Sequence, residues 1–72
     1  MSPETSLAIS VNGTAETVTQ GTTPADILTR LGLTGPGIAV AVNDAVVRRH
    51  ELGALVLSNG DRVEIIRAVG GG

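Results

Sequence analysis

The chain closes with three consecutive glycines, Gly70, Gly71 and Gly72, directly after the strand-like run 63–69. Glycine loses more conformational entropy on ordering than any other residue, so a terminal glycine triplet adds nothing to a fold. The triplet is thin and has no Cβ atoms, and it can therefore be drawn extended into a narrow active site. The reactive group that it presents there is the C-terminal carboxylate of Gly72. The alternative is an end without function, because small residues accumulate at chain termini.

Other kinds of catalytic chemistry lack the residues they need. There is no Cys and His50 is the only His, so neither a disulfide framework nor a His/Cys zinc site can form. The neighbours of His50 are typical of a solvated turn rather than of a Ser-His-Asp triad. Asp61 and Glu64 are more typical of turn and strand surfaces than of an acid–base pair. The sequence therefore predicts no catalytic residue and no metal site, and a stand-alone enzyme is not expected.

Length and composition limit the class of protein further. Seventy-two residues allow one small domain, whose core must be aliphatic because Phe, Tyr and Trp are absent. The net charge of −2 and the lack of stacking aromatics exclude typical nucleic-acid binding. The longest apolar run, residues 38–42, is too short to span a membrane, and the first residues do not resemble a signal peptide. We expect a soluble cytoplasmic protein.

The first half of the chain predicts a hairpin and a helix. Residues 7–11 alternate between apolar and polar, and Asn12-Gly13 is a strong signal for a tight turn, so residues 14–19 should return as the second strand. Thr23 fits the N-cap of a helix, with Pro24 at its first position and Asp26 placed to complete a capping box. Gly32 is expected to end the helix in a left-handed conformation.

The second half predicts three strands. Residues 38–42 are continuously apolar and β-branched, which is typical of a central strand, and residues 45–47 return after the turn Asn43-Asp44. Residues 52–57 are apolar and ambiguous. A turn at residues 58–61 then leads into the final strand, residues 62–68. A helix between a hairpin and later strands must cross one face of a single sheet, which makes an α+β domain.

This order is that of the ubiquitin-like β-grasp fold, a mixed sheet of four to five strands packed on one main helix. The segments 11–13, 21–28, 38–43 and 59–66, together with the ending 68–72, resemble the sulfur carriers of bacterial thiamin biosynthesis, the ThiS family. The resemblance covers nearly the whole chain from Leu7. It predicts a flexible extension at residues 1–6, a β-grasp domain at residues 7–69 and a flexible tail at residues 70–72.

The resemblance implies a function in which partners perform the chemistry. A ubiquitin-activating-like enzyme uses ATP to adenylate the carboxylate of Gly72, and sulfur from a cysteine desulfurase pathway then replaces AMP. The resulting thiocarboxylate donates its sulfur to thiazole synthase, with Gly70 and Gly71 threading the terminus into the partners' active sites. The chain lacks Lys, and with it any phosphate-binding loop of the Walker type, so ATP would be bound by the partner and no cofactor by this chain.

The tail cannot supply specificity alone, so an exposed patch near it should dock on the activating enzyme. Val69, Arg67 and Ile65 lie closest to the tail along the last strand and are the predicted partner contacts. Three alternatives stay open. The chain is a sulfur carrier for another pathway, such as molybdopterin or cysteine synthesis, or it is a ubiquitin-like protein modifier, or it is a β-grasp interaction module without terminal chemistry.

Overall fold

The computed structural model describes residues 6–33 and 35–67. Within them the elements follow in the order β1 (Ser6–Val11), β2 (Thr14–Thr19), α1 (Pro24–Leu31), β3 (Ile38–Val42), β4 (Ala45–Val47), the 3-10 helix η2 (Arg49–Glu51) and β5 (Arg62–Arg67). The predicted succession of hairpin, helix, strand, short return strand and final strand is confirmed. Strand β1 begins one residue earlier than the predicted start of the domain.

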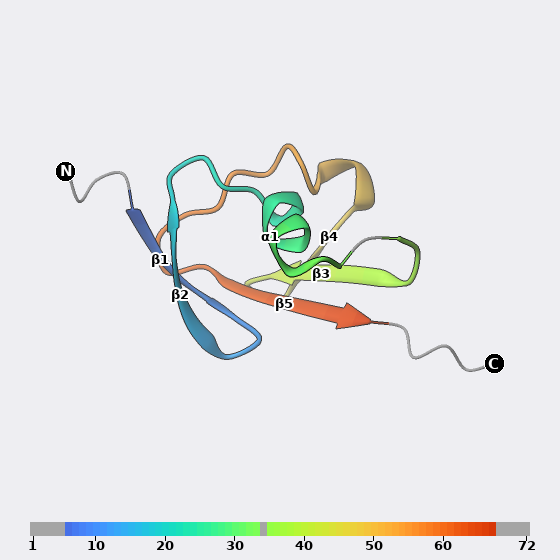
Figure 1. Cartoon of the computed structure of the whole chain (residues 1–72), viewed down its shortest axis with the longest axis horizontal. Coiled ribbons are helices and arrows are strands. Elements are labelled where there is room, and N and C mark those ends of the chain that lie inside the picture. The colour runs from blue at the N-terminus through green and yellow to red at the C-terminus, as the bar shows by residue number, and fades with distance from the viewer. Residues whose placement is uncertain (1–5, 34, 68–72) are drawn as a thin grey trace.

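The strands form one mixed sheet in the order β2-β1-β5-β3-β4 (Figure 1). Strand β1 pairs antiparallel with β2 and parallel with β5, while β3 pairs antiparallel with β4 and with β5. The last strand, β5, is therefore the central one. Helix α1 crosses one face of this sheet, so that the described part of the chain has two layers (Figure 1).

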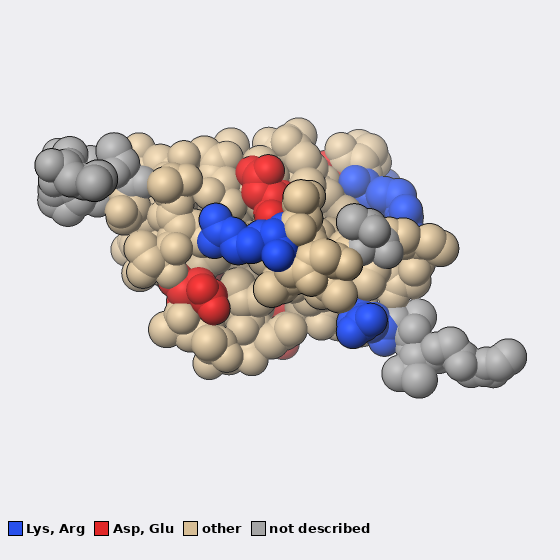
Figure 2. Space-filling model, viewed as in Figure 1, with Lys and Arg blue, Asp and Glu red and all other residues tan. Residues whose placement is uncertain are grey.

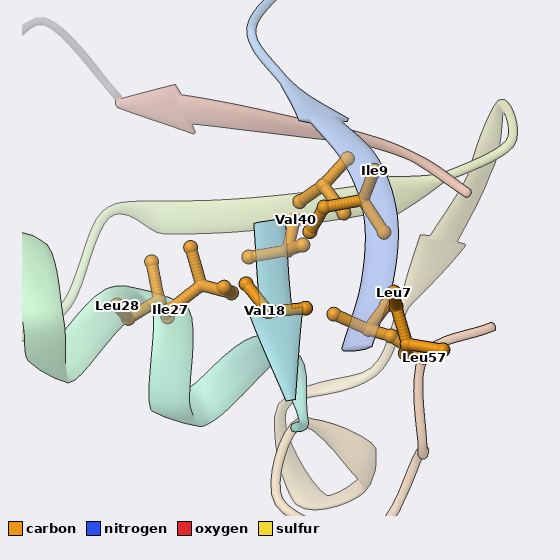
Figure 3. Packing of buried hydrophobic residues seen from close by; sticks show 8 residues of the cluster. Leu7, Ile9, Val18, Ile27, Leu28, Val40 and Leu57 are labelled. Atoms are coloured by element: carbon orange, nitrogen blue, oxygen red, sulfur yellow. The ribbon is translucent and has the colours of Figure 1, made fainter. Parts of the chain in front are cut away.

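The core lies between the helix and the sheet and consists only of aliphatic side chains. Figure 3 shows Ile27 from α1 beside Val18 from β2, with Val40 of β3 close by. Val63, at the middle of the sheet, is fully buried. The other members of the cluster are Leu7, Ile9, Leu28 and Leu57. Because each inward position holds a compact branched or linear side chain, the core closes without any aromatic residue.

Local signals in the sequence correctly located the first turn and both ends of the helix. Asn12 and Gly13 have φ angles of 51° and 84°, the left-handed pair that a two-residue type I′ turn requires. Gly32 adopts φ 71° at the end of α1, and its N–H and that of Leu33 bond back to the carbonyl oxygen of Leu28. Glycine has no Cβ to oppose this conformation, so the helix ends here.

The capping box at the start of α1 makes a testable contribution to stability. The Asp26 N–H donates to Thr23 Oγ1 over 3.2 Å, and the Thr23 N–H donates to Asp26 Oδ2 over 3.0 Å. Thr23→Ala should lower the free energy of unfolding by about 0.5–2 kcal/mol, because it leaves a helix N–H without its acceptor. Thr29→Ala is the matched control, since Thr29 is exposed and only donates to the Ala25 carbonyl within the helix. Urea titrations followed by circular dichroism should show a loss for the first variant alone, and equal losses would contradict it.

The ambiguous segment between β4 and β5 forms no strand but is tied to the helix side of the domain. Leu52 accepts a hydrogen bond from the Ala25 N–H, and the Leu57 N–H donates to the Thr22 carbonyl, both over 2.9 Å. Leu57 is buried and joins the core. Apolar residues are therefore needed here although the segment has neither helical nor strand periodicity.

Among the residues that the structure describes, no helix is long and apolar enough to cross a membrane.

Candidate functional site at the end of strand β5

Strand β5 leads from the centre of the sheet towards the predicted reactive terminus. It pairs with β3 from Val63 to Arg67 and with β1 only at Arg62 and Val63. The predicted site residues Gly70, Gly71 and Gly72, and the predicted contact Val69, lie outside the described residues. The described part of the site therefore ends at Arg67, and its geometry is that of the strand that carries the tail.

Two asparagine side chains accept hydrogen bonds from the backbone of β5, one from its first residue and one from its fourth. Asn12 Oδ1 accepts the N–H of Ile65 over 2.8 Å, and Asn43 Oδ1 accepts the N–H of Arg62 over 2.9 Å. Asn43 Nδ2 also donates to Asp61 Oδ1 over 2.9 Å. Both asparagines have positive φ angles in the turns that follow β1 and β3. Both asparagines were predicted as turn residues, and their second role was missed, because its only signal in the sequence is Asn at a turn position where Gly or Asp is also tolerated.

The two faces of β5 have different environments. Val63 and Ile65 point to the helix side, where Ile65 is partly buried and packs against the core. Ile66 points to the opposite, outer face and is 54% exposed. Arg67 is exposed at the end of the strand. Of the predicted partner contacts, Arg67 is thus accessible and Ile65 is partly buried against the core, while the exposed Ile66 between them was not among the predictions.

Ile66 belongs to a small apolar area on the outer face of the sheet. It lies opposite Ala39 across the β3–β5 pair, and Ala41 lies opposite Val46 across the β3–β4 pair. Val46 is 72% exposed and Ile66 54%, whereas Ala39 is partly buried and Ala41 is 6% exposed, so on the face that α1 leaves uncovered the area is open to solvent at Val46 and Ile66. We call these four residues, Ala39, Ala41, Val46 and Ile66, the outer patch. A solvent-exposed apolar area beside a functional terminus is typical of a protein-binding surface.

Charges around the site do not form one continuous basic surface. Figure 2 shows the basic side chains in separate groups on the viewed face, the central one directly beside an acidic group. Arg62, at the start of β5, pairs with Asp44 (Nη2 to Oδ2 2.6 Å), and both side chains are more than half exposed. An exposed pair of this kind contributes about 0–1 kcal/mol. Arg67 is consequently the basic group on β5 that lies next to the tail without a described acidic partner.

Within the described residues, no group of three or more His, Cys, Asp or Glu side chains is arranged to hold a metal ion. His50 is exposed in η2, beside Arg49 and Glu51, as expected for a solvated turn. Asp61 serves the turn before β5, where its Oδ2 accepts the Ser58 N–H over 2.7 Å. The polar groups near β5 thus support its backbone.

Comparisons with known proteins agree with this arrangement. The model of the ThiS family matches residues 6–72. A crystal structure of the thiamine biosynthesis protein ThiS from Geobacter metallireducens superposes with a TM-score of 0.71 at 28% identity, covering 92% of this chain and all of that one. A thiazole synthase from Magnetococcus marinus is 38% identical over 66 residues, which are 92% of this chain but 20% of that protein. The chain therefore spans about a fifth of the length of this curated relative. The structural match confirms the predicted β-grasp fold.

Proposed function

Because the chain belongs to the ThiS family, we propose that it is a sulfur carrier of thiamin biosynthesis whose working group is the carboxylate of Gly72. The observation that carries this proposal is that the family match continues through the glycine tail to residue 72. The central position of β5 supports it further. A terminus that follows the middle strand of the sheet is attached to a rigid element.

The proposed chemistry follows from the weakness of a carboxylate as an electrophile. A carboxylate oxygen of Gly72 attacks the α-phosphorus of ATP in a ubiquitin-activating-like adenylyltransferase, and pyrophosphate leaves. The terminal sulfur of a persulfide from a cysteine desulfurase pathway then attacks the acyl carbon, and AMP leaves. A thiol such as cysteine reduces the S–S bond of the resulting acyl persulfide, which releases the thiocarboxylate and forms a disulfide. Thiocarboxylate sulfur is a far better nucleophile than carboxylate oxygen, so it can be transferred onward. In this scheme the chain is a co-substrate rather than an enzyme, and ATP is used by the partner.

Thiazole synthase is the proposed recipient of the sulfur. The support is that a thiazole synthase from Magnetococcus marinus contains a segment similar to nearly all of this chain. Joining two proteins in one chain raises the effective concentration of each at the other, which is useful when one delivers a group to the other. The outer patch and Arg67 are the surfaces that we propose for docking on partners, because Ile66 and Arg67 are exposed on β5 and Val46 is exposed on the same face as Ile66. We place these reactions in the cytoplasm.

A reconstitution followed by intact-protein mass spectrometry tests the proposal. The chain is incubated with the adenylyltransferase, ATP and a desulfurase with cysteine, and it should gain the mass of one sulfur-for-oxygen exchange, confined to a C-terminal peptide that contains Gly72. Adding thiazole synthase and its substrates should return the mass to its starting value. A chain that stays unmodified under these conditions would refute the proposal.

The same spectra separate the other functions. Isopeptide adducts on lysines of other proteins would indicate a protein modifier. A thiocarboxylate that thiazole synthase leaves intact would indicate a carrier for molybdopterin or cysteine synthesis. Omitting ATP is the internal control, because no acyl adenylate can then form and the mass should not change.

A further inference from the structure

The central strand β5 is paired along its whole length on one side only. Its register with β3 extends to Arg67, whereas its register with β1 ends at Val63. Figure 1 shows β5 running on past the tip of the β1–β2 hairpin while β3 still lies beside it. Within residues 6–33 and 35–67, no strand continues the position of β1 next to the last residues of β5. The strand that carries the tail thus has a short open edge.

The hydrogen-bond pattern identifies the groups on this edge. The backbone N–H and C=O groups of the even-numbered residues of β5 point to β3, since the Asn43 N–H donates to the Arg62 carbonyl. Those of the odd-numbered residues point to the β1 side, since the Asn12 N–H donates to the Val63 carbonyl. Backbone groups alternate in this way along every strand of a ladder. The Ile65 carbonyl and the Arg67 N–H therefore point to the side where β1 has ended.

Asn12 determines where the open edge begins. In a parallel ladder the Asn12 carbonyl would accept the Ile65 N–H, but the left-handed turn at φ 51° directs the chain away. Its side-chain oxygen takes that bond instead, over 2.8 Å. The ladder is thereby completed up to the Ile65 N–H and no further. Among the described residues, the groups that follow up to the Arg67 N–H are one acceptor, the Ile65 carbonyl, and one donor, the Arg67 N–H, spaced for a single extended residue.

We infer that this edge receives an extended segment of the adenylyltransferase, which adds to the sheet beside β5 as the tail enters the active site. One residue of that segment, parallel to β5 as β1 is, donates its N–H to the Ile65 carbonyl and accepts the Arg67 N–H. It lies opposite Ile66, so its side chain is on the outer face, where Ile66 is 54% exposed. An apolar side chain fits that position. The inference rests on the proposed function, which supplies the partner.

Strand addition suits a terminus that must be aligned rather than merely held. The bonds are made by the backbone, so they set the direction and register of β5 relative to the partner. Arg67 is the last described residue before the tail. An error in register there would move Gly72 along the active site by one residue, about 3.3 Å. Pairing at Ile65 and Arg67 therefore positions the carboxylate without any side chain in the tail.

Comparing Arg67→Pro with Arg67→Ala tests the inference. Both variants lose the guanidinium, but only proline also removes the N–H, and that N–H serves no bond to β3. Titration calorimetry with the adenylyltransferase should show the proline variant binding roughly two- to tenfold more weakly than the alanine variant, as for the loss of one hydrogen bond. Thermal melts by circular dichroism should be alike for both. Equal affinities of the two variants would overturn the inference.

Amide hydrogen exchange on the wild-type chain gives an answer that needs no variant. The Arg67 amide should exchange fast in the free protein and slowly in the complex. The Ile66 amide, bonded to β3, should be slow in both and serves as the control. An Arg67 amide that stays fast in the complex contradicts strand addition. If the wild-type chain is not adenylated at all, the proposed function fails and the inference with it; if it is adenylated, these comparisons judge the inference alone.

Discussion

Deleting Gly71 and Gly72 is expected to abolish thiocarboxylate formation while leaving the folded domain intact. The new terminus at Gly70 is shorter by two residues, about 7 Å of extended chain, so its carboxylate no longer reaches the α-phosphorus of ATP. Reacting atoms must approach to about 3–3.5 Å, and rate falls steeply with misplacement. The pairs between β5 and β3 end at Arg67 and are untouched by the deletion. Intact mass spectra after reconstitution measure the effect directly.

Gly72→Ala is the matched variant for this deletion. It keeps the length of the tail and its carboxylate and adds only a Cβ, so it tests whether the partner's channel accepts a side chain. We expect adenylation at least an order of magnitude slower than in the wild type, because a single misfitted group at the reacting centre costs a large factor in rate. Wild-type thiocarboxylate yield from the truncated chain would refute a terminal role and favour an interaction module.

The second large effect is on stability, and it concerns the face of α1 that packs on the sheet. Ile27 is 4% exposed and touches the core, whereas Leu31, one turn further along, is 51% exposed. Ile27→Ala should lower the free energy of unfolding by about 2–5 kcal/mol, because it removes buried methyl groups and leaves a cavity. A domain of this size has a total stability near the low end of about 5–15 kcal/mol. A large share of the population should then unfold on mild heating.

Leu31→Ala is the control on the same helix. It is also an aliphatic side chain truncated to alanine, but with half of its surface in water it should lose less than about 1–1.5 kcal/mol. Urea titrations must be followed by circular dichroism, since the chain has no Trp or Tyr for fluorescence. Equal losses for the two variants would mean that the helix packs through a different face. Adenylation of the folded fraction should be unchanged for both, because neither residue lies on β5.

The helix and the first turn were predictable because their signals are local. Thr23, Pro24 and Asp26 act within one turn of helix, and Asn12-Gly13 needs only its own backbone angles to reverse the chain. The aliphatic residues of the core were also identifiable, as period-two or helical patterns specify which positions face inward. Leu31 is the exception. It shares the helical spacing of Ile27, but it lies at the rim of the groove that Val11 and Val18 line, and half of it stays exposed.

Contacts between distant segments were not predictable in the same way. The bond from the Ile65 N–H to Asn12 joins residues 53 apart in sequence. Nothing local to either residue indicates it, because it depends on β5 lying beside β1. The choice between Ile65 and Ile66 as the exposed residue has the same origin. Alternation places adjacent residues on opposite faces, and only the position of the helix decides which face is covered.

By itself, the amino-acid sequence determined the order of the elements, their turns and caps, the aliphatic core and the glycine terminus as the one chemically distinctive feature. These follow from interactions within a few residues and from composition. Only the tertiary structure decided that β5 lies between β1 and β3, that Ile66 belongs to the outer patch, and that the edge of β5 opens at Ile65. The reason is physical: which strands are neighbours depends on pairings between distant segments, and these set the backbone groups that remain free beside the tail.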